Sequence, residues 1–168
     1  MTDNSQNRPA PDRPDPVAAR QCEITESARA RSGMTAYDYA DQFVLFTGLA
    51  ATPHEWARAA LDEAAGAKGQ FVWRVVLGLR LTRRSGIEQV AGWRIADRGD
   101  SWITLEARSW LFVGRLVVEV LDGSVSLACF LRYERPLGAR VWGAVSPAHR
   151  RVAPLLLTDA RRLLPERS

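Results

Sequence analysis

The chain has 168 residues and a formal net charge of +4 at pH 7, and 46% of its residues are hydrophobic. This length leaves room for one folded domain and a tail. The basic excess is mild and is carried by short groups of arginines rather than by a dense stripe, which argues against a nucleic-acid partner.

The cysteines and the apolar segments indicate a cytoplasmic protein. Cys22 lies in the N-terminal segment and Cys129 in a predicted strand, so we expect no disulfide framework. The N-terminus lacks the apolar run of a signal peptide. Arg74 and Arg115 interrupt the most apolar stretches, which therefore fall short of the roughly 18 residues of a membrane span.

The N-terminal segment has the composition of a disordered tail. Prolines recur from Pro9 to Pro16, charges are scattered, and large apolar residues are almost missing. Such a segment cannot bury enough apolar surface to offset the entropy of ordering it. We therefore predict a disordered tail over residues 1–36 and a single folded domain over residues 37–168.

The first predicted elements of the domain are a strand and a helix. Residues 41–48 are rich in aromatic and branched side chains, which favours a strand. Thr52, Pro53 and Glu55 have the form of a helix start, with an N-cap, a proline at the first helical position and a capping box. Gly66 is expected to end this helix.

Residues 71–82 fit two structures. Their odd positions are all apolar, as in a strand. The stretch is also apolar nearly all round as a helix, which suits a short helix clamped between two surfaces. We predict a helix here, mainly because of the family resemblance described below.

A tight hairpin is predicted at Asp122-Gly123, because Asp-Gly at the two loop positions is the strongest short-range hairpin signal. This turn sets Val120 opposite Val125 on the face expected to be buried. The same register pairs Val118 with Leu127, Leu116 with Cys129 and Gly114 with Leu131.

The two preceding strands are expected to continue the meander through a three-residue loop at residues 98–100. The predicted turns agree on one apolar face, and a slip by one residue would invert every side chain. The expected inner pairs are Ile95 with Ile103, Trp93 with Leu105, Ala91 with Ala107 and Leu105 with Leu116, and Glu106 pairs with Arg115 on the outer face.

One long helix is predicted over residues 138–164. Its apolar positions recur at spacings of three and four, which indicates a stripe facing the sheet. Pro147 and Pro154 are expected to kink it, and Ser146 offers a cap that would make it two helices in line. The stripe comprises Val141, Val145, Ala148, Val152 and Leu155.

Together these elements predict an α+β fold in which an antiparallel meander wraps against a long kinked C-terminal helix, with two short helices after the first strand. The residues between sheet and helix either fill a core or line a cavity. Trp93 and Trp142 are expected to point inward, where filling the core is the commoner role of an indole, and Trp102 to point outward. Tyr133 is the best candidate for a polar group on the inner face.

Two blocks of sequence carry a family resemblance. The first is Leu79-Arg80-Leu81 before Gly86-Ile87, and the second is Gly138-Ala139-Arg140-Val141-Trp142 followed by Ser146-Pro147-Ala148-His149-Arg150. In these blocks and in the order of its elements the chain resembles the START and Bet v1-like superfamily of helix-grip proteins, also called SRPBCC, and within it a bacterial domain family of unknown function. Relatives often have a His-Leu pair where this chain has Trp102-Ile103, so a role for that histidine does not carry over.

The resemblance implies a cavity between sheet and helix that accepts hydrophobic or amphipathic molecules. We therefore expect a non-catalytic domain that binds a small hydrophobic molecule, although fold alone does not fix function. The residues expected to line the cavity are Trp93, Ile95, Leu105, Leu116, Val118, Cys129, Leu131, Tyr133, Trp142 and Val145.

Two other functions stay open. The first is an enzyme of the cyclase or dehydratase type that uses His149, Tyr133 or Arg140, with His149 as the catalytic candidate, although a structural role for this histidine is preferred. The second is a packed domain that binds a protein partner through an outer face with Trp102, Val117 and Phe130. No histidines, cysteines or carboxylates lie at metal-ligand spacing, so neither a metal nor another cofactor is expected.

Overall fold

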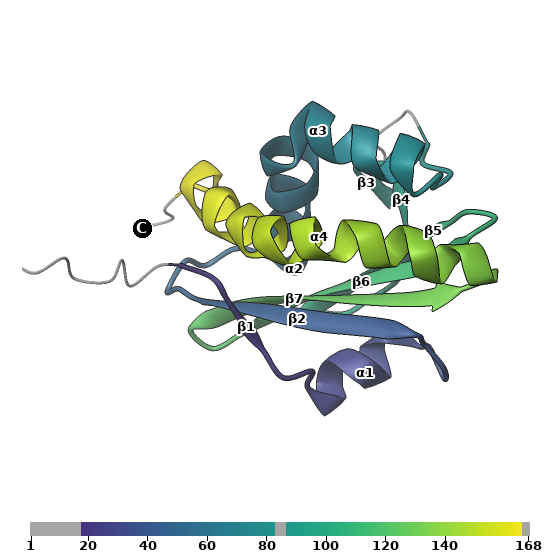
Figure 1. The fold of residues 1–168 in the computed structure, drawn as a ribbon. Coiled ribbons are helices and arrows are strands. Elements are labelled where there is room, and N and C mark those ends of the chain that lie inside the picture. The colour runs from purple at the N-terminus through teal and green to yellow at the C-terminus, as the bar shows by residue number, and fades with distance from the viewer. Residues whose placement is uncertain (1–17, 83–86, 166–168) are drawn as a thin grey trace, which may run out of the picture.

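The computed structural model describes residues 18–82 and 87–165, and within them the strands form one antiparallel sheet (Figure 1). The sheet is seven-stranded, in the order β1-β2-β7-β6-β5-β4-β3. Its strands are β1 (Arg20–Cys22), β2 (Tyr39–Phe46), β3 (Gln89–Val90), β4 (Trp93–Arg98), β5 (Trp102–Arg108), β6 (Phe112–Leu121) and β7 (Ser124–Tyr133).

Helices cover both faces of the sheet. The long helix α4 and the helices that follow β2 lie on one face, and α1 lies on the other (Figure 1). The predicted α+β fold, with two short helical units ahead of the meander and a long C-terminal helix, is confirmed. The helices are α1 (Glu26–Ser32), α2 (Pro53–Arg58), α3 (Gly66–Phe71) and α4 (Pro136–Leu163), with π-helical segments η1 (Ala59–Ala64) and η2 (Val72–Val76).

The predicted disordered tail is wrong for the residues after 17, because β1 and α1 lie within it. Thr25 caps α1 by accepting a hydrogen bond from the Ala28 N–H, and Gly33 ends the helix at φ 60°. Ala28 and Ser32 are buried against the sheet. The rest of the predicted tail, residues 1–17, lies outside the described part of the chain.

The helix start at Thr52 is confirmed, with Pro53 in the first turn and a complete capping box to Glu55. The helix expected to end at Gly66 continues as η1 to Ala64, and Gly66, at φ 51°, is the first residue of α3. The ambiguous stretch 71–82 divides in two. It is helical as far as Val76, and residues 77–82 belong to neither a helix nor a strand, with Leu77, Leu79 and Leu81 buried.

None of the residues of α3 and η2, all of which the structure describes, is buried. The prediction of a helix clamped between two surfaces is therefore wrong for this segment. Phe71 and Val75 are 60% and 64% exposed. Trp73 alone turns inward far enough to pack against the core.

The register of the β6–β7 hairpin is the predicted one, with Val120 opposite Val125 and Leu116 opposite Cys129. The pairs Leu105–Leu116 and Glu106–Arg115 between β5 and β6 are also confirmed. The β4–β5 register is wrong, because Ile95 pairs with Leu105 instead of Ile103. The pairing is shifted by two residues at Ile95, so Trp93 and Ile95 keep their predicted face, and a bulge between Ile95 and Asp97 makes the shift three residues beyond it.

α4 has nearly the predicted extent, but part of the face that was predicted to be buried is exposed. The helix runs without interruption through Pro147 and Pro154, so the division at Ser146 does not occur. Ala148 is exposed, and so are Val152 and Leu155, although the predicted stripe included all three. The residues that α4 buries are Gly138, Trp142, Ser146, Ala153, Leu157 and Ala160.

The main hydrophobic core fills the layer between the inner sheet face and the helices on that side. A second, smaller core lies under α1 and contains Ala28, Val117, Ala128 and Phe130. Val117 and Phe130 are therefore not available on an outer docking face, as one hypothesis required. Within the described residues, no helix combines the length and the apolar character needed to cross a bilayer.

Candidate functional site

The residues predicted to line a cavity all belong to the main core, between the inner face of the sheet and the helices on that side. Eight of them are buried in the main core, and Tyr133 and Val145 pack at its edge. Trp93 lies over Gly114, where a Cβ atom would come within 3.2 Å of Leu131 and 3.6 Å of Trp93. Trp73 packs edge-on against Trp93, with ring centroids 5.8 Å apart. Aromatic side chains thus fill this part of the interior.

Three buried indoles carry N–H groups that have no hydrogen-bond partner among the described residues. They are the Nε1 atoms of Trp56, Trp93 and Trp142. A buried donor left without an acceptor costs about 1–3 kcal/mol. Native interiors contain few such groups, so three in one layer call for an explanation.

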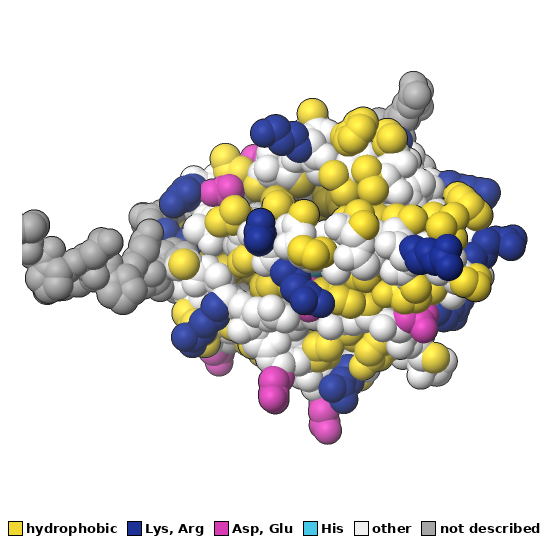
Figure 2. All heavy atoms as spheres, in the orientation of Figure 1, with side chains coloured by type: hydrophobic (Ala, Val, Ile, Leu, Met, Phe, Trp, Pro, Cys, Tyr) yellow, Lys and Arg dark blue, Asp and Glu magenta, His cyan; other side chains and the backbone are white. Residues whose placement is uncertain are grey.

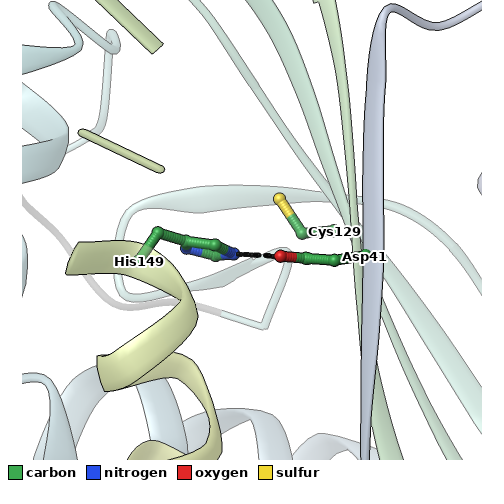
Figure 3. Close-up of side chains that lie close together, drawn as sticks. All are labelled: Asp41, Cys129 and His149. Atoms are coloured by element: carbon green, nitrogen blue, oxygen red, sulfur yellow. Dashed lines mark hydrogen bonds and ion pairs between the residues drawn. The ribbon is translucent and has the colours of Figure 1, made fainter. Parts of the chain in front are cut away.

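A cluster of three polar side chains, Asp41, Cys129 and His149, lies at the inner face (Figure 3). Its His149 ring lies beside Trp142. Asp41 on β2 and Cys129 on β7 are cross-strand partners, and His149 reaches them from α4. His149 Nε2 lies 3.1 Å from Asp41 Oδ2 and 3.3 Å from Oδ1. One ligand atom from each of the three residues lies within 4.8 Å of the other two.

The local sequence explains this convergence. Alternate residues of a strand share a face, so Asp41 points inward with Phe43 and Leu45. On α4, His149 falls on the same side as the buried Trp142 and Ala153, seven residues after one and four before the other. A carboxylate among inward apolar positions is the signal in the sequence that would have pointed to Asp41.

Tyr39 and Trp142 complete the surroundings of this group. The Tyr39 hydroxyl donates to Asp41 Oδ2 at 2.5 Å and accepts from Arg150 Nε at 3.2 Å. The Trp142 ring lies 5.1 Å from the His149 ring and 5.0 Å from the Tyr39 ring, measured between centroids. His149 is therefore held between aromatic rings and a carboxylate.

Burial controls the protonation of Cys129 and of the neighbouring Tyr39. It raises the pKa of the Cys129 thiol well above its usual value, and the charge of Asp41 adds to this effect. It also raises the pKa of Tyr39, whose hydrogen bond to Asp41 acts in the same direction. Both groups are protonated near neutral pH in the absence of another ligand.

The structure separates His149 from the other residues named for catalysis. Arg140 is exposed on α4. Tyr133 packs against Phe112 at the far end of the sheet, with ring centroids 6.0 Å apart. The sequence prediction therefore identified His149 but missed its partners Asp41 and Tyr39.

The outer face of the sheet carries a second cluster of charges. Glu106 and Glu119 are buried there under α1, where Glu119 accepts from Ser27 and from Arg31 Nε. A pocket of about 470 Å³ opens between α1 and the strands β4 and β5. Arg31 lies at this pocket with its guanidinium carbon 4.5 Å from the ring centroid of Trp102.

Comparisons with known proteins add no homologue to this description. Neither a family model, nor a curated protein, nor a solved structure matches the chain.

Proposed function

We propose that this chain is a helix-grip domain of the START and Bet v1-like type that binds a small amphipathic molecule between the sheet and α4. The observation that carries the proposal is the set of unpartnered N–H groups on Trp56, Trp93 and Trp142. Acceptor atoms on a ligand would recover the free energy that these donors lose on burial. The ligand is expected to combine an apolar body with hydrogen-bond acceptors.

The surroundings of Trp142 support an amphipathic ligand rather than a purely apolar one. Tyr39 and Phe43 supply aromatic surface next to His149, and Asp41 adds a buried charge. Binding sites of this kind have mostly apolar walls with a few polar groups that fix the ligand's orientation.

We expect the ligand to enter the layer between the sheet and α4 by way of α3 and η2. These segments contribute no buried residue, and Phe71 and Val75 are exposed. Figure 2 shows hydrophobic side chains gathered over these helices and along α4. Segments with π-helical geometry often occur at functional sites, and η2 is such a segment.

The first experiment searches for the ligand directly. Native mass spectrometry of the protein purified from its own host is expected to show a bound molecule, and a panel of fatty acids and aromatic metabolites is expected to raise the melting temperature. Saturation at 100 times Kd stabilises the folded state by about 2.7 kcal/mol. No bound molecule and no shift across the panel would overturn the proposal.

The second experiment tests the role of the indole donors. Trp142→Phe keeps an aromatic ring and removes the unpartnered N–H, so we expect the unliganded protein to be at least as stable as the wild type and ligand affinity to fall about tenfold. Trp110→Phe is the matched control, because Trp110 is exposed. Equal ligand affinity of both variants, measured by calorimetry, would contradict a role for Trp142.

A cyclase or dehydratase-type enzyme is the second candidate, and the contact between Asp41 and His149 favours it. A carboxylate that orients an imidazole is a common arrangement in acid–base catalysis. If the ligand is converted, we expect His149→Gln to abolish turnover while the protein still binds. Unchanged turnover in this variant, measured by mass spectrometry of the product, would exclude His149 as the acid–base group.

We also propose a cytoplasmic location. Cys22 and Cys129 are free thiols, and structural disulfides are rare in reducing compartments. Fractionation of host cells followed by immunodetection tests this, and recovery with secreted proteins would overturn it.

A further inference from the structure

We infer that Asp41, Cys129 and His149 bind a divalent transition-metal ion of the zinc class. This inference goes beyond the proposed function and does not depend on it. Metal binding is measured without the organic ligand, so each proposal can fail while the other stands.

The donor set is the first argument. A thiolate, an imidazole nitrogen and a carboxylate oxygen are the ligands that zinc prefers, and three protein ligands leave the fourth tetrahedral position for water or a substrate. Magnesium and calcium select oxygen donors, so Cys129 disfavours both.

The geometry is the second argument. Metal–ligand bonds of about 2.0–2.3 Å place neighbouring ligand atoms of a tetrahedral zinc site roughly 3.3–3.8 Å apart. His149 Nε2 and Asp41 Oδ2 already lie 3.1 Å apart, and all three ligand atoms lie within 4.8 Å of one another. A closing movement of about 1 Å by the thiol would complete the set.

The position of Cys129 is the third argument. Its side chain is 6% exposed, and its sulfur has no hydrogen bond within the described part of the chain. The Cys129 side chain lies beside the contact between Asp41 and His149 (Figure 3), and its sulfur is within 4.8 Å of a ligand atom of each. A thiol at this place adds a third metal-binding side chain to the pair Asp41 and His149.

The supporting structure around the ligands fits the same inference. Tyr39 donates its hydroxyl proton to Asp41, as outer partners do for metal-binding carboxylates. Two ligands lie on the paired strands β2 and β7 and the third on α4, so their backbones are fixed by the fold. When the metal ion binds, the Cys129 thiol releases its proton to solvent, and the resulting thiolate sulfur bonds to the metal.

Cobalt(II) is the probe for the first test, because a thiolate ligand produces a charge-transfer band that oxygen and nitrogen ligands do not. Untagged full-length protein, stripped with a chelator, is titrated with cobalt chloride. We expect one ion per chain, the charge-transfer band, and the visible spectrum of a tetrahedral site. Displacement by zinc then gives the zinc affinity.

The chain supplies its own matched controls. Cys129→Ser is expected to remove the charge-transfer band and lower zinc affinity about a hundredfold or more. Cys22→Ser and His54→Gln replace the other cysteine and the other histidine of the sequence and are expected to change neither. His149→Gln, at a half-buried position, should also lower the affinity and provides a second variant if Cys129→Ser unfolds.

Two results would overturn the inference. One is a wild-type protein, folded by near-ultraviolet circular dichroism, that shows no saturable cobalt or zinc binding in the micromolar range. The other is a cobalt complex whose charge-transfer band is lost in Cys22→Ser and kept in Cys129→Ser.

Discussion

Glu106 holds the outer face of the sheet to α1. Arg94 Nη2 and Arg108 Nε donate to Glu106 Oε1, and Arg115 donates twice to its other oxygen. Arg115 also donates to the Ser32 carbonyl at the end of α1. Burial raises the pKa of Glu106, but the hydrogen bonds from Arg108, Arg94 and Arg115 outweigh it and lower this pKa to about 2.

This lowered pKa gives Glu106 a defined pH dependence. Between pH 4.5, the ordinary value, and about pH 2, the unfolded state binds more protons than the folded state. The charge of Glu106 therefore stabilises the fold fully above pH 4.5. That stabilisation is lost as pH falls toward 2.

We predict that Glu106→Gln lowers the free energy of unfolding by about 2–3 kcal/mol at pH 7. The difference from wild type should shrink as pH falls below 4.5, because Glu106 then becomes protonated in the unfolded wild-type chain while it stays charged in the folded one. Urea denaturation at pH 7, 4 and 3 measures it. Glu134→Gln, at an exposed pair with Arg132, is the control and should cost less than about 0.5 kcal/mol. A Glu106→Gln cost that is the same at pH 3 and pH 7 would contradict the assignment.

At the scale of elements, α4 shows what the sequence predicts and what it does not. Its helical period and flanking residues predict the extent of the helix. The face depends on shape as well as on hydrophobicity, because small residues let the helix approach the sheet. A Cβ atom on Gly138 would lie 2.9 Å from the Leu111 carbonyl oxygen. The branched residues Val152 and Leu155 looked more apolar, yet they face outward.

The candidate site, too, could not be predicted from the sequence. Asp41, Cys129 and His149 come from two strands and a helix that lie far apart along the chain. Spacing rules for metal ligands detect neighbours in sequence, so they do not detect this set. The β2–β7 register supplies the missing information, since it sets Asp41 opposite Cys129.

The sequence did not lead us to predict α1, because we took the low apolar content of its segment as a sign of disorder. Much of its contact with the sheet is polar. Arg31 bonds to Glu119, and the Thr104 hydroxyl donates to the Arg31 carbonyl oxygen. Only Ala28 enters the small core under the helix. A short polar segment can therefore fold when the sheet offers buried charges that match it.

We predict that Ala28→Glu lowers the free energy of unfolding by about 2 kcal/mol or more, because it places an unpaired carboxylate in that core. Ala30→Glu, at an exposed position of the same helix beside the pocket, should stay within about 0.5 kcal/mol of wild type. Chemical denaturation with constant m-values measures both. Equal stabilities would mean that α1 is detached from the sheet in solution.

At the scale of the whole molecule, stability is expected to be uneven. The hairpin of β6 and β7 has α1 on one face and α4 on the other (Figure 1), and most of its residues are buried. The segment from Gly66 to Val76 lies at the opposite extreme, with no buried residue among those described there. Regions with few buried apolar contacts open locally at lower free energy than the core.

Hydrogen exchange tests this difference and connects it to ligand entry. Amides of α3 and η2 should exchange through local opening at a free energy about 3 kcal/mol or more below that of β7, whose amides should exchange only on global unfolding. The neighbouring helix α2, which buries Pro53, Trp56 and Ala57, is the internal control and should be better protected than α3. If a ligand enters beneath α3 and η2, its binding should slow exchange there by the same factor as in β7, because neither the locally open form nor the unfolded chain can hold it. Protection of α3 and η2 equal to that of β7 in the free protein would mean that this segment is not the entrance.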